Sequence, residues 1–239
     1  MSSNEAESTT GTVLVMVPHP DDADFLAAGT IAVWARDGWR VILVVITDGS
    51  KGTEDPDMTP ERIIRIRKDE QHRAAAHLGI ADLIFLAYED GMLEDSHHLR
   101  EDLTRLIRQH RPRRVICMDP TMRFGGDGYV NHPDHVASGN AVLAAVSLLA
   151  RNRPSFRQLL ADGLEPHKVG ELYVGGTDQA NHWIDISRTI DRKIAALCEH
   201  KSQISPEQIE HMIRDWAKRD AEGREMEYAE SFRLMKLDR

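Results

Sequence analysis

The sequence predicts a single α/β domain with a doubly wound, Rossmann-like fold, in which helices cover both faces of a mostly parallel sheet. Apolar, β-branched runs alternate along the chain with segments whose apolar residues recur at helical spacing. The strand candidates are apolar throughout, as expected for strands buried on both faces. With 239 residues, 41% of them hydrophobic, the chain can bury one sizeable core.

The alternation begins with a strand over residues 12–17 and a helix over residues 25–36, in which Leu26, Ile31 and Trp34 fall at helical spacing. Further elements are expected as a strand over 40–47, a helix opened by Thr59-Pro60-Glu61, a strand over 83–87, a helix over 99–110, a strand over 114–118 and a helix over 132–150. Each strand is thus followed by a helix, which is the pattern of a parallel sheet.

Beyond Arg151 the pattern is looser. The elements expected there are strands over 171–174 and 182–186 and helices over 188–200 and 206–218. Ile209, Met212, Ile213 and Trp216 form a stripe on the last helix, which is usually a packed face and could instead join identical subunits in a homo-oligomer. We expect residues 1–11 to be a disordered N-terminal segment and residues 12–239 to form one domain.

The composition excludes several partners. The chain has 30 basic and 39 acidic residues, a net charge of −9, which disfavours nucleic acids and anionic membranes. Its only cysteines, Cys117 and Cys198, imply no disulfide framework. Neither a signal peptide nor an apolar run of the roughly 18 residues needed for a spanning helix is present. We therefore expect a cytoplasmic protein.

Two clusters of polar residues follow the first and fourth strand candidates. The first strand ends in His19-Pro20-Asp21-Asp22-Ala23-Asp24. The fourth is followed by the glycine-rich segment 124–128 and then by His132-Pro133-Asp134-His135 at a helix start. In the strand order 3-2-1-4-5-6, strands one and four are neighbours, and ligands bind beyond their carboxyl ends. The two clusters are therefore expected to face each other across one crevice.

Such a crevice would suit a catalytic metal. Two histidines and one carboxylate are the protein ligands of many catalytic zinc sites, and the same set suits iron(II). His132 and His135 are three residues apart, so both can face the crevice, one on the metal and one on the substrate. Of Asp21 and Asp22, one would bind the metal and the other would accept a proton from a metal-bound water. Helix capping by these aspartates would be the simpler alternative, but it leaves the histidines unexplained.

With these motifs the sequence resembles the LmbE-like, or PIG-L, family of N-acetylglucosaminyl deacetylases. The family's two motifs match His19-Pro20-Asp21-Asp22 and His132-Pro133-Asp134-His135. Supporting matches are Gly29-Thr30-Ile31, Thr47-Asp48-Gly49, and Arg67 with Glu70 and Gln71. The resemblance implies a zinc-dependent hydrolase that removes an N-acyl group, most often N-acetyl, from a small amino sugar or glycoconjugate.

The resemblance also implies a role for each motif residue. His19, Asp22 and His135 would hold zinc, or iron(II) in its place, Asp21 would be the general base, His132 would stabilise the transition state, and Asp134 would orient His132. An arginine of the second helical segment would contact the substrate, which suggests Arg67, with Arg65 close enough in helix phase to be the alternative. The chain departs from the family at Ala23, where a glutamate is usual, and at Tyr129, which precedes the second motif by three positions instead of two.

Other residues are candidates for the rim of the crevice. Arg123 lies in the segment before the second motif, and His182, next to Trp183, starts a strand; with Tyr129 they are expected to contact the substrate. No role and a surface position are expected for the histidines on or near predicted helices, namely His72, His77, His97, His98, His110, His200 and His211.

Two other functions compete with the deacetylase. Asp22-Ala23-Asp24 after the first strand resembles the DxD turn of a magnesium-dependent phosphatase of the haloacid dehalogenase type, which would leave three histidines idle. A non-catalytic, metal-containing sugar-binding protein would need neither Asp21 nor His132. A dinucleotide enzyme is disfavoured because the first turn lacks G-x-G-x-x-G.

Overall fold

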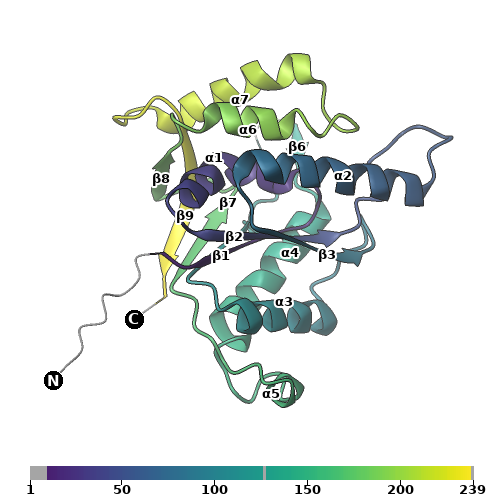
Figure 1. Cartoon of the computed structure of the whole chain (residues 1–239), viewed down its shortest axis with the longest axis vertical. Coiled ribbons are helices and arrows are strands. Elements are labelled where there is room, and N and C mark those ends of the chain that lie inside the picture. Colours follow the sequence, from purple (N-terminus) through teal and green to yellow (C-terminus); the bar gives the residue numbers. More distant parts are fainter. Residues whose placement is uncertain (1–9, 126–127, 238–239) are drawn as a thin grey trace.

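The computed structural model describes residues 10–125 and 128–237, and its main sheet has seven strands with helices on both faces (Figure 1). In spatial order the strands are β3 (Asp82–Tyr88), β2 (Arg40–Thr47), β1 (Thr12–Val17), β4 (Arg114–Met118), β7 (Glu171–Gly175), β9 (Ala229–Lys236) and β8 (His182–Asp185). The pairs from β3 to β7 are parallel, and β9 is antiparallel to both of its neighbours. The predicted doubly wound, mostly parallel fold is confirmed.

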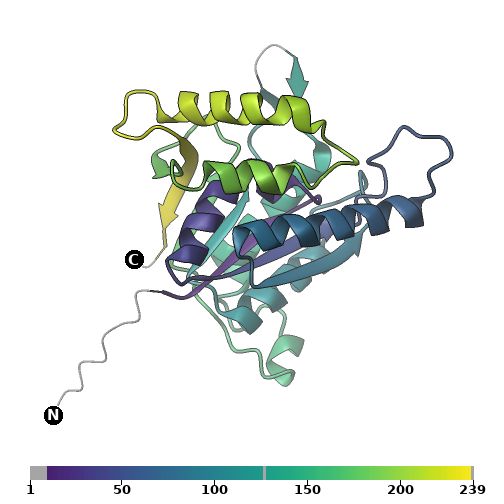
Figure 2. The same ribbon diagram turned by 45° about the horizontal axis from the view of Figure 1, so that its top comes forward.

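The helices lie in two layers. Helices α1, α2, α6 and α7 lie on one side of the sheet, and α3, α4 and α5 lie on the other (Figures 1 and 2). Their bounds are α1 (Asp22–Arg36), α2 (Pro60–Leu78), α3 (His97–His110), α4 (Pro133–Ala144), α5 (Gln158–Ala161), α6 (Ile190–Leu197) and α7 (Pro206–Ala221). The helix predicted from His132 to Ala150 is α4 followed by a π-helical turn, Ala145–Leu149.

The two layers explain why the central strands are apolar throughout. In β1, Val13, Val15 and Val17 pack under α1, whereas Leu14 and Met16 pack against α3 and α4 on the opposite face. All five side chains are fully buried. Burial on both faces therefore produces the continuous apolar runs of β1 and β2.

Two elements differ from the sequence prediction. Strand β9 was not predicted, because Glu230, Arg233 and Lys236 interrupt its apolar residues. It is an antiparallel strand near the sheet edge, where alternation replaces an apolar run. The glycine-rich segment expected as a loop contains a hairpin of β5 (Phe124–Gly125) and β6 (Tyr129–Val130). Residues 126–127 of that segment lie outside the described residues.

Several smaller predictions concern the ends and surface of the domain. Of the segment 1–11, only Thr10 and Gly11 are among the described residues, and the Gly11 carbonyl accepts a hydrogen bond from the Arg40 N–H. Cys117 is buried in β4, and it and Cys198 are free thiols. Across the described ranges, no helix is both long enough and apolar enough to cross a membrane.

Candidate metal centre and active site

The two motifs meet at the carboxyl ends of β1 and β4, which are neighbouring parallel strands, as predicted. His19 lies two residues beyond β1, and Asp22 is the first residue of α1. His132 caps the N-terminus of α4, so His135 lies in the first turn of that helix. The sheet thus brings together residues more than 100 positions apart in the sequence.

His19, Asp22 and His135 form one group whose ligand atoms all lie within 4.8 Å of one another. The His19 Nδ1 is 3.0 Å from Asp22 Oδ2, and the His135 Nε2 is 3.2 Å from Asp22 Oδ1. Tetrahedral zinc with bonds of about 2.0–2.1 Å separates its ligand atoms by about 3.3 Å. The three side chains therefore present suitable atoms at suitable spacing for a divalent ion.

In each of the two histidines, the ring nitrogen that points away from Asp22, called the outer nitrogen here, lies beside a hydrogen-bond acceptor. The His19 Nε2 is 3.2 Å from Asp134 Oδ2 and 3.2 Å from Asp90 Oδ1. The His135 Nδ1 is 3.0 Å from Asn131 Oδ1. Metal-binding histidines typically donate their outer N–H to a carboxylate or carbonyl, which orients the ring and leaves the other nitrogen for the metal. Asp134 and Asn131 occupy these supporting positions.

The charges around His19 favour a cation. Burial alone would lower the pKa of His19, but the carboxylates of Asp22, Asp134 and Asp90 raise it to about 12. Burial disfavours the ionised Asp22, yet His135 and His19 hold the pKa of this carboxyl well below its usual range. A positive charge is thus strongly stabilised at this point, and a bound divalent ion would supply one without a proton.

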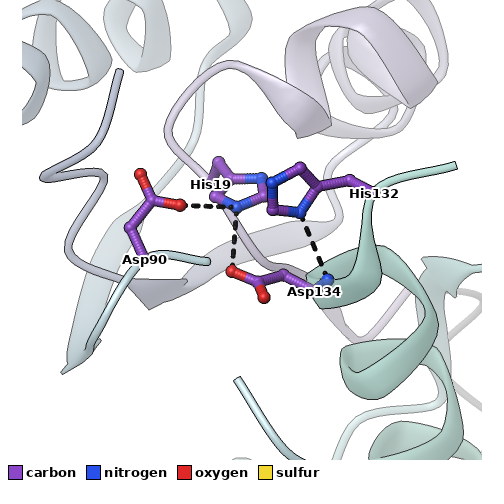
Figure 3. A group of neighbouring side chains, drawn as sticks. All are labelled: His19, Asp90, His132 and Asp134. Carbon is purple, nitrogen blue, oxygen red and sulfur yellow. Dashed lines mark hydrogen bonds and ion pairs between the residues drawn. The ribbon is translucent and has the colours of Figure 1, made fainter. Parts of the chain in front are cut away.

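A second group, His19, Asp90, His132 and Asp134, also satisfies the spacing for a metal ion (Figure 3). Its carboxylates already accept backbone N–H groups: Asp134 accepts those of Gly91 at 2.7 Å and Leu93 at 3.2 Å, and Asp90 accepts that of Lys51 at 3.0 Å. Such bonds suit carboxylates that hold a ligand histidine in place. The group formed with Asp22 is therefore the better candidate for the metal.

His132 lies beside the candidate metal site. Its ring is 4.7 Å from that of His19, centroid to centroid, and its Nδ1 accepts the Asp134 backbone N–H at 3.2 Å. The neutral imidazole then carries its proton on Nε2. Burial and the neighbouring His19 lower the pKa of His132. The Asp134 carboxylate lies against His19, and Asp134 contacts His132 through its backbone N–H, so the predicted contact between Asp134 and His132 runs through the main chain.

Asp21 adopts a left-handed backbone conformation, with φ 98°, and its side chain makes no capping bond to α1. Arg67, buried in α2, donates to the Pro20 carbonyl at 2.7 Å, to the Gly49 carbonyl at 3.2 Å and to Asp21 Oδ2 at 3.2 Å. Burial raises the pKa of Asp21 to about 6, against the opposing effect of the Arg67 guanidinium. Asp21 is thus held as a carboxylate that can exchange a proton near neutral pH.

A buried chain of hydrogen bonds supports Asp21 from below. The Asp21 N–H donates to Gln71 Oε1 at 2.9 Å, and Gln71 Nε2 donates to Asp24 Oδ2 at 2.9 Å. The His200 Nε2 lies 3.0 Å from the same oxygen. Asp24 and His200 are fully buried, so the expected surface position of His200 is wrong. Asp24 is committed to Gln71 and His200, which argues against a DxD turn of a phosphatase.

A cavity of about 220 Å³ opens beside the metal group and is bordered by His19, Asp21, Arg67, Asp90 and His132. Arg67 therefore lies where a substrate would bind, although most of its donors are engaged by the protein. The Tyr129 hydroxyl is 3.2 Å from Asn131 Oδ1, the same oxygen that lies against His135 Nδ1.

The remaining predicted substrate residues do not join the site. Arg123 is exposed before β5, and in its only described hydrogen bond its carbonyl accepts the Asn131 N–H. His182 lies in the edge strand β8 and packs against Tyr173, with 5.8 Å between ring centroids. Because β7 and β9 separate β8 from β4, His182 is not at the rim of the crevice.

Sequence reasoning missed Asp90, Asn131, Asp24 and His200 as parts of the site. A signal was present for Asp90, which follows β3 at the same sheet edge that carries both motifs. Asn131 precedes His135 by four residues, and its role depends on a side-chain contact that no sequence pattern marks. His200 reaches Asp24 only because α6 packs on α1.

Fold and site together define a doubly wound α/β protein with a histidine and carboxylate cluster able to hold a metal ion at the carboxyl edge of its sheet. Residues 14–146 match the family model described as PIG-L, GlcNAc-PI de-N-acetylase. This match spans both motifs and more than half of the chain. The chain belongs to the PIG-L family of hydrolytic N-deacetylases, as the two motifs predicted.

Named relatives agree with this assignment. A diacetylchitobiose deacetylase of Thermococcus kodakarensis is 32% identical over 207 residues, covering 86% of this chain and 74% of its own. A probable N-acetyl-alpha-D-glucosaminyl L-malate deacetylase 2 of Bacillus anthracis is 31% identical over 199 residues, covering 81% of each chain. The structure of the N,N'-diacetylchitobiose deacetylase from Pyrococcus horikoshii, with an inhibitor bound, has a TM-score of 0.88 at 30% identity, covering 95% of this chain and 84% of its own.

Proposed function

We propose that this protein hydrolyses the N-acetyl group of an N-acetylglucosamine-type sugar or glycoconjugate, using a zinc ion held by His19, Asp22 and His135. One observation carries the proposal: three ligand atoms converge, and the outer nitrogens of both histidines are held by Asp134 and Asn131. We further propose that residues 12–239 form the catalytic domain.

The chain's own residues would divide the chemistry as follows. When bound, zinc would act as a Lewis acid toward the amide carbonyl and toward water. Asp21 borders the cavity, is oriented by Arg67 and has a pKa raised to about 6, so it can take the proton of the attacking water. His132 keeps a donor N–H at Nε2 and borders the same cavity, where it would stabilise the developing oxyanion. The protonated Asp21 would then pass the proton taken from water to the leaving amine.

The test separates metal binding from proton transfer. Asp21→Asn keeps the shape of the side chain but cannot accept a proton, so zinc content should stay near one per chain while turnover falls by about 10² to 10⁴. Asp22→Asn and His135→Ala should lose zinc first. Metal analysis and release of free amine from N-acetylglucosamine and its conjugates measure both effects. A zinc-free Asp21→Asn, or a fully active one, would contradict this division of roles.

The phosphatase alternative has a different product. If the protein released inorganic phosphate from phosphate esters in the presence of Mg²⁺ while N-acetylated sugars stayed intact, the deacetylase proposal would be wrong. A sugar-binding protein without catalysis would bind N-acetylglucosamine, hold zinc and release no amine. Both outcomes can be distinguished in the same set of assays.

A further inference from the structure

The turn that follows β2 forms one wall of the cavity beside the candidate metal centre. Residues 49–52 make this turn, in which the Gly52 N–H donates to the Gly49 carbonyl at 3.4 Å, and Lys51 and Gly52 border the cavity. The next residues, 53–58, stand out from the molecule before α2 begins (Figures 1 and 2). The hydrogen bonds described for these residues join them only to one another. Gly52 is therefore the last residue of the wall that other elements hold in place.

The two ends of the turn are held by different residues. At the inner end, the Gly49 carbonyl accepts a hydrogen bond from Arg67 at 3.2 Å, and the Lys51 N–H donates to Asp90 Oδ2 at 3.0 Å. At the outer end, the Gly52 carbonyl accepts the side-chain amide of Gln203 at 2.7 Å. Gln203 lies in the linker between α6 and α7. Its amide makes the described hydrogen bond that ties Gly52 to an element outside the connection from β2 to α2.

Packing around Gly52 is equally close. A Cβ added at Gly52 would overlap the Arg67 guanidinium and would lie 2.7 Å from Gln203 Oε1. Only glycine fits its main chain between these two side chains. Gly52 is thus clamped between Arg67, which orients Asp21, and Gln203, which belongs to neither sequence motif.

The linker from α6 to α7 is fixed without the Gln203 side chain. The Ser202 N–H and hydroxyl donate to the buried carboxylate of Glu70 in α2, at 2.8 and 2.7 Å. The Ser202 hydroxyl in turn accepts the Gln203 amide at 3.0 Å, so this amide has one N–H on Ser202 and one on Gly52. A donor fixed on one side and a locally bonded segment on the other indicate that Gln203 positions the cavity wall.

We infer that Gln203 is a positioning residue for substrate binding: braced by Ser202 and Glu70, it holds Gly52 and so keeps the cavity at the width that the substrate requires. The inference rests on the proposed function, because the substrate of that reaction is what the cavity binds. Gln203 holds the outer end of the turn, whereas Arg67 and Asp90 hold the end beside the reacting groups. Loss of Gln203 should therefore weaken binding and leave the chemical step nearly unchanged.

Steady-state kinetics of the zinc-loaded protein with N-acetylglucosamine test this role. Gln203→Met keeps the length of the side chain and removes its donor. One net hydrogen bond changes the population of a conformation by a factor of about 2 to 10. We therefore expect KM to rise by about three- to tenfold, with kcat within about twofold and zinc content unchanged, because a smaller fraction of the protein is ready to bind. An unchanged KM, or a fall in kcat as large as the rise in KM, would overturn the inference.

Two further variants complete the kinetic test. Gln158→Met makes the same substitution at an exposed position of α5 and should change neither KM nor kcat. Ser202→Ala removes the brace of Gln203 and should raise KM by less than Gln203→Met does. The double variant should then match Gln203→Met, because both substitutions act through one bond to Gly52. Effects that multiply independently would overturn the inference.

Hydrogen exchange separates the inference from the proposed function. If the unmodified protein released no amine from N-acetylated sugars, the proposed function would fail, and the backbone amides of residues 50–54 would still report on the wall. Their exchange should be faster in Gln203→Met than in the unmodified protein or in Gln158→Met. Equal exchange in all three proteins would overturn the inference, whether or not the protein is a deacetylase.

Discussion

At Asp21 a residue with a side chain occupies the left-handed region of backbone conformation, with φ 98°. Such a conformation is sparsely populated, and it persists where the surroundings determine it. Here the surroundings are Gln71 on the N–H and Arg67 on the preceding carbonyl and the carboxylate. The Asp24 carboxylate can only accept hydrogen bonds, so the Gln71 side chain must turn its NH₂ group toward Asp24. Its amide oxygen then faces Asp21 and accepts the Asp21 N–H.

The substitution Gln71→Leu tests this support. It removes the acceptor of the Asp21 N–H, so the carboxylate should lose its fixed position while His19, Asp22 and His135 remain. We expect kcat to fall by about 10-fold or more, with zinc content and KM little changed, because a misplaced base affects the transition state more than binding. Gln109→Leu, an exposed position on α3, is the control. Equal losses in both variants, or loss of zinc in Gln71→Leu, would count against the assignment.

The sequence predicted the site residues that are contiguous and missed those that act from other elements. His19, Asp21, Asp22, His132 and His135 stand in two short motifs at strand ends, where the fold rule places ligands. The partner of a side chain, in contrast, is decided by packing. Asp134 was predicted to orient His132, whereas its carboxylate faces His19, because the orientation of that carboxylate depends on the N–H groups of the segment after β3.

Helix α1 carries Asp22 and is anchored along its length by groups from distant elements. Lys193 of α6 donates to the Phe25 carbonyl at 2.6 Å, and Glu230 of β9 accepts the N–H groups of Gly29 at 2.9 Å and Thr30 at 2.7 Å. The Lys193 ammonium and the Glu230 carboxylate are themselves 2.7 Å apart and buried. In an α-helix the Gly29 N–H donates to the Phe25 carbonyl, four residues earlier. Lys193 and Glu230 therefore bind the acceptor and the donor of the same helical hydrogen bond.

Gly29 is required where α1 meets the segment after β8. A Cβ added at Gly29 would lie 2.7 Å from the Cβ of Ile186, which cannot swing away as a chain end could. Gly29→Ala should therefore lower the free energy of unfolding by about 1–3 kcal/mol, although alanine is the better helix former. Urea unfolding measures the change. Gly11→Ala, whose Cβ would meet only atoms at 3.6 Å, should have little effect, and a stabilised Gly29→Ala would refute the explanation.

On the scale of the whole molecule, the order of the first four strands followed from the sequence and the far edge of the sheet did not. The parallel strands are buried on both faces and give a strong apolar signal. Strand β9 carries charged residues that face outward or, like Glu230, are neutralised by a partner from α6. The sequence alone does not reveal that the charge of Glu230 is paired, because its partner Lys193 comes from a helix that meets β9 only in the folded molecule.

The buried His200 couples the stability of the molecule to pH. Burial would lower the pKa of His200, but Asp24 raises it overall. Its charge therefore stabilises the fold fully below the unfolded pKa of about 6.5, and this contribution is lost as pH rises through the higher folded pKa. His200→Gln should destabilise the protein more at pH 6 than at pH 9 in urea unfolding. His211→Gln, exposed on α7, is the control. If the free energy of unfolding of His200→Gln differed from that of the unmodified protein by the same amount at pH 6 and at pH 9, the coupling would be contradicted.

The position of β9 between β7 and β8 has a consequence for the order in which the molecule can assemble during synthesis. Residues 12–144, which contain every proposed zinc ligand, leave the ribosome long before residue 229. Strand β8 is made earlier than β9, which is its described pairing partner. Until β9 is made, β8 cannot join the sheet and the edge of β7 that β9 will cover stays unpaired. Glu230 arrives with the same strand and then takes its place against α1. The part of the molecule that carries the proposed zinc ligands can therefore take shape first, and the edge formed by β9 and β8 closes last.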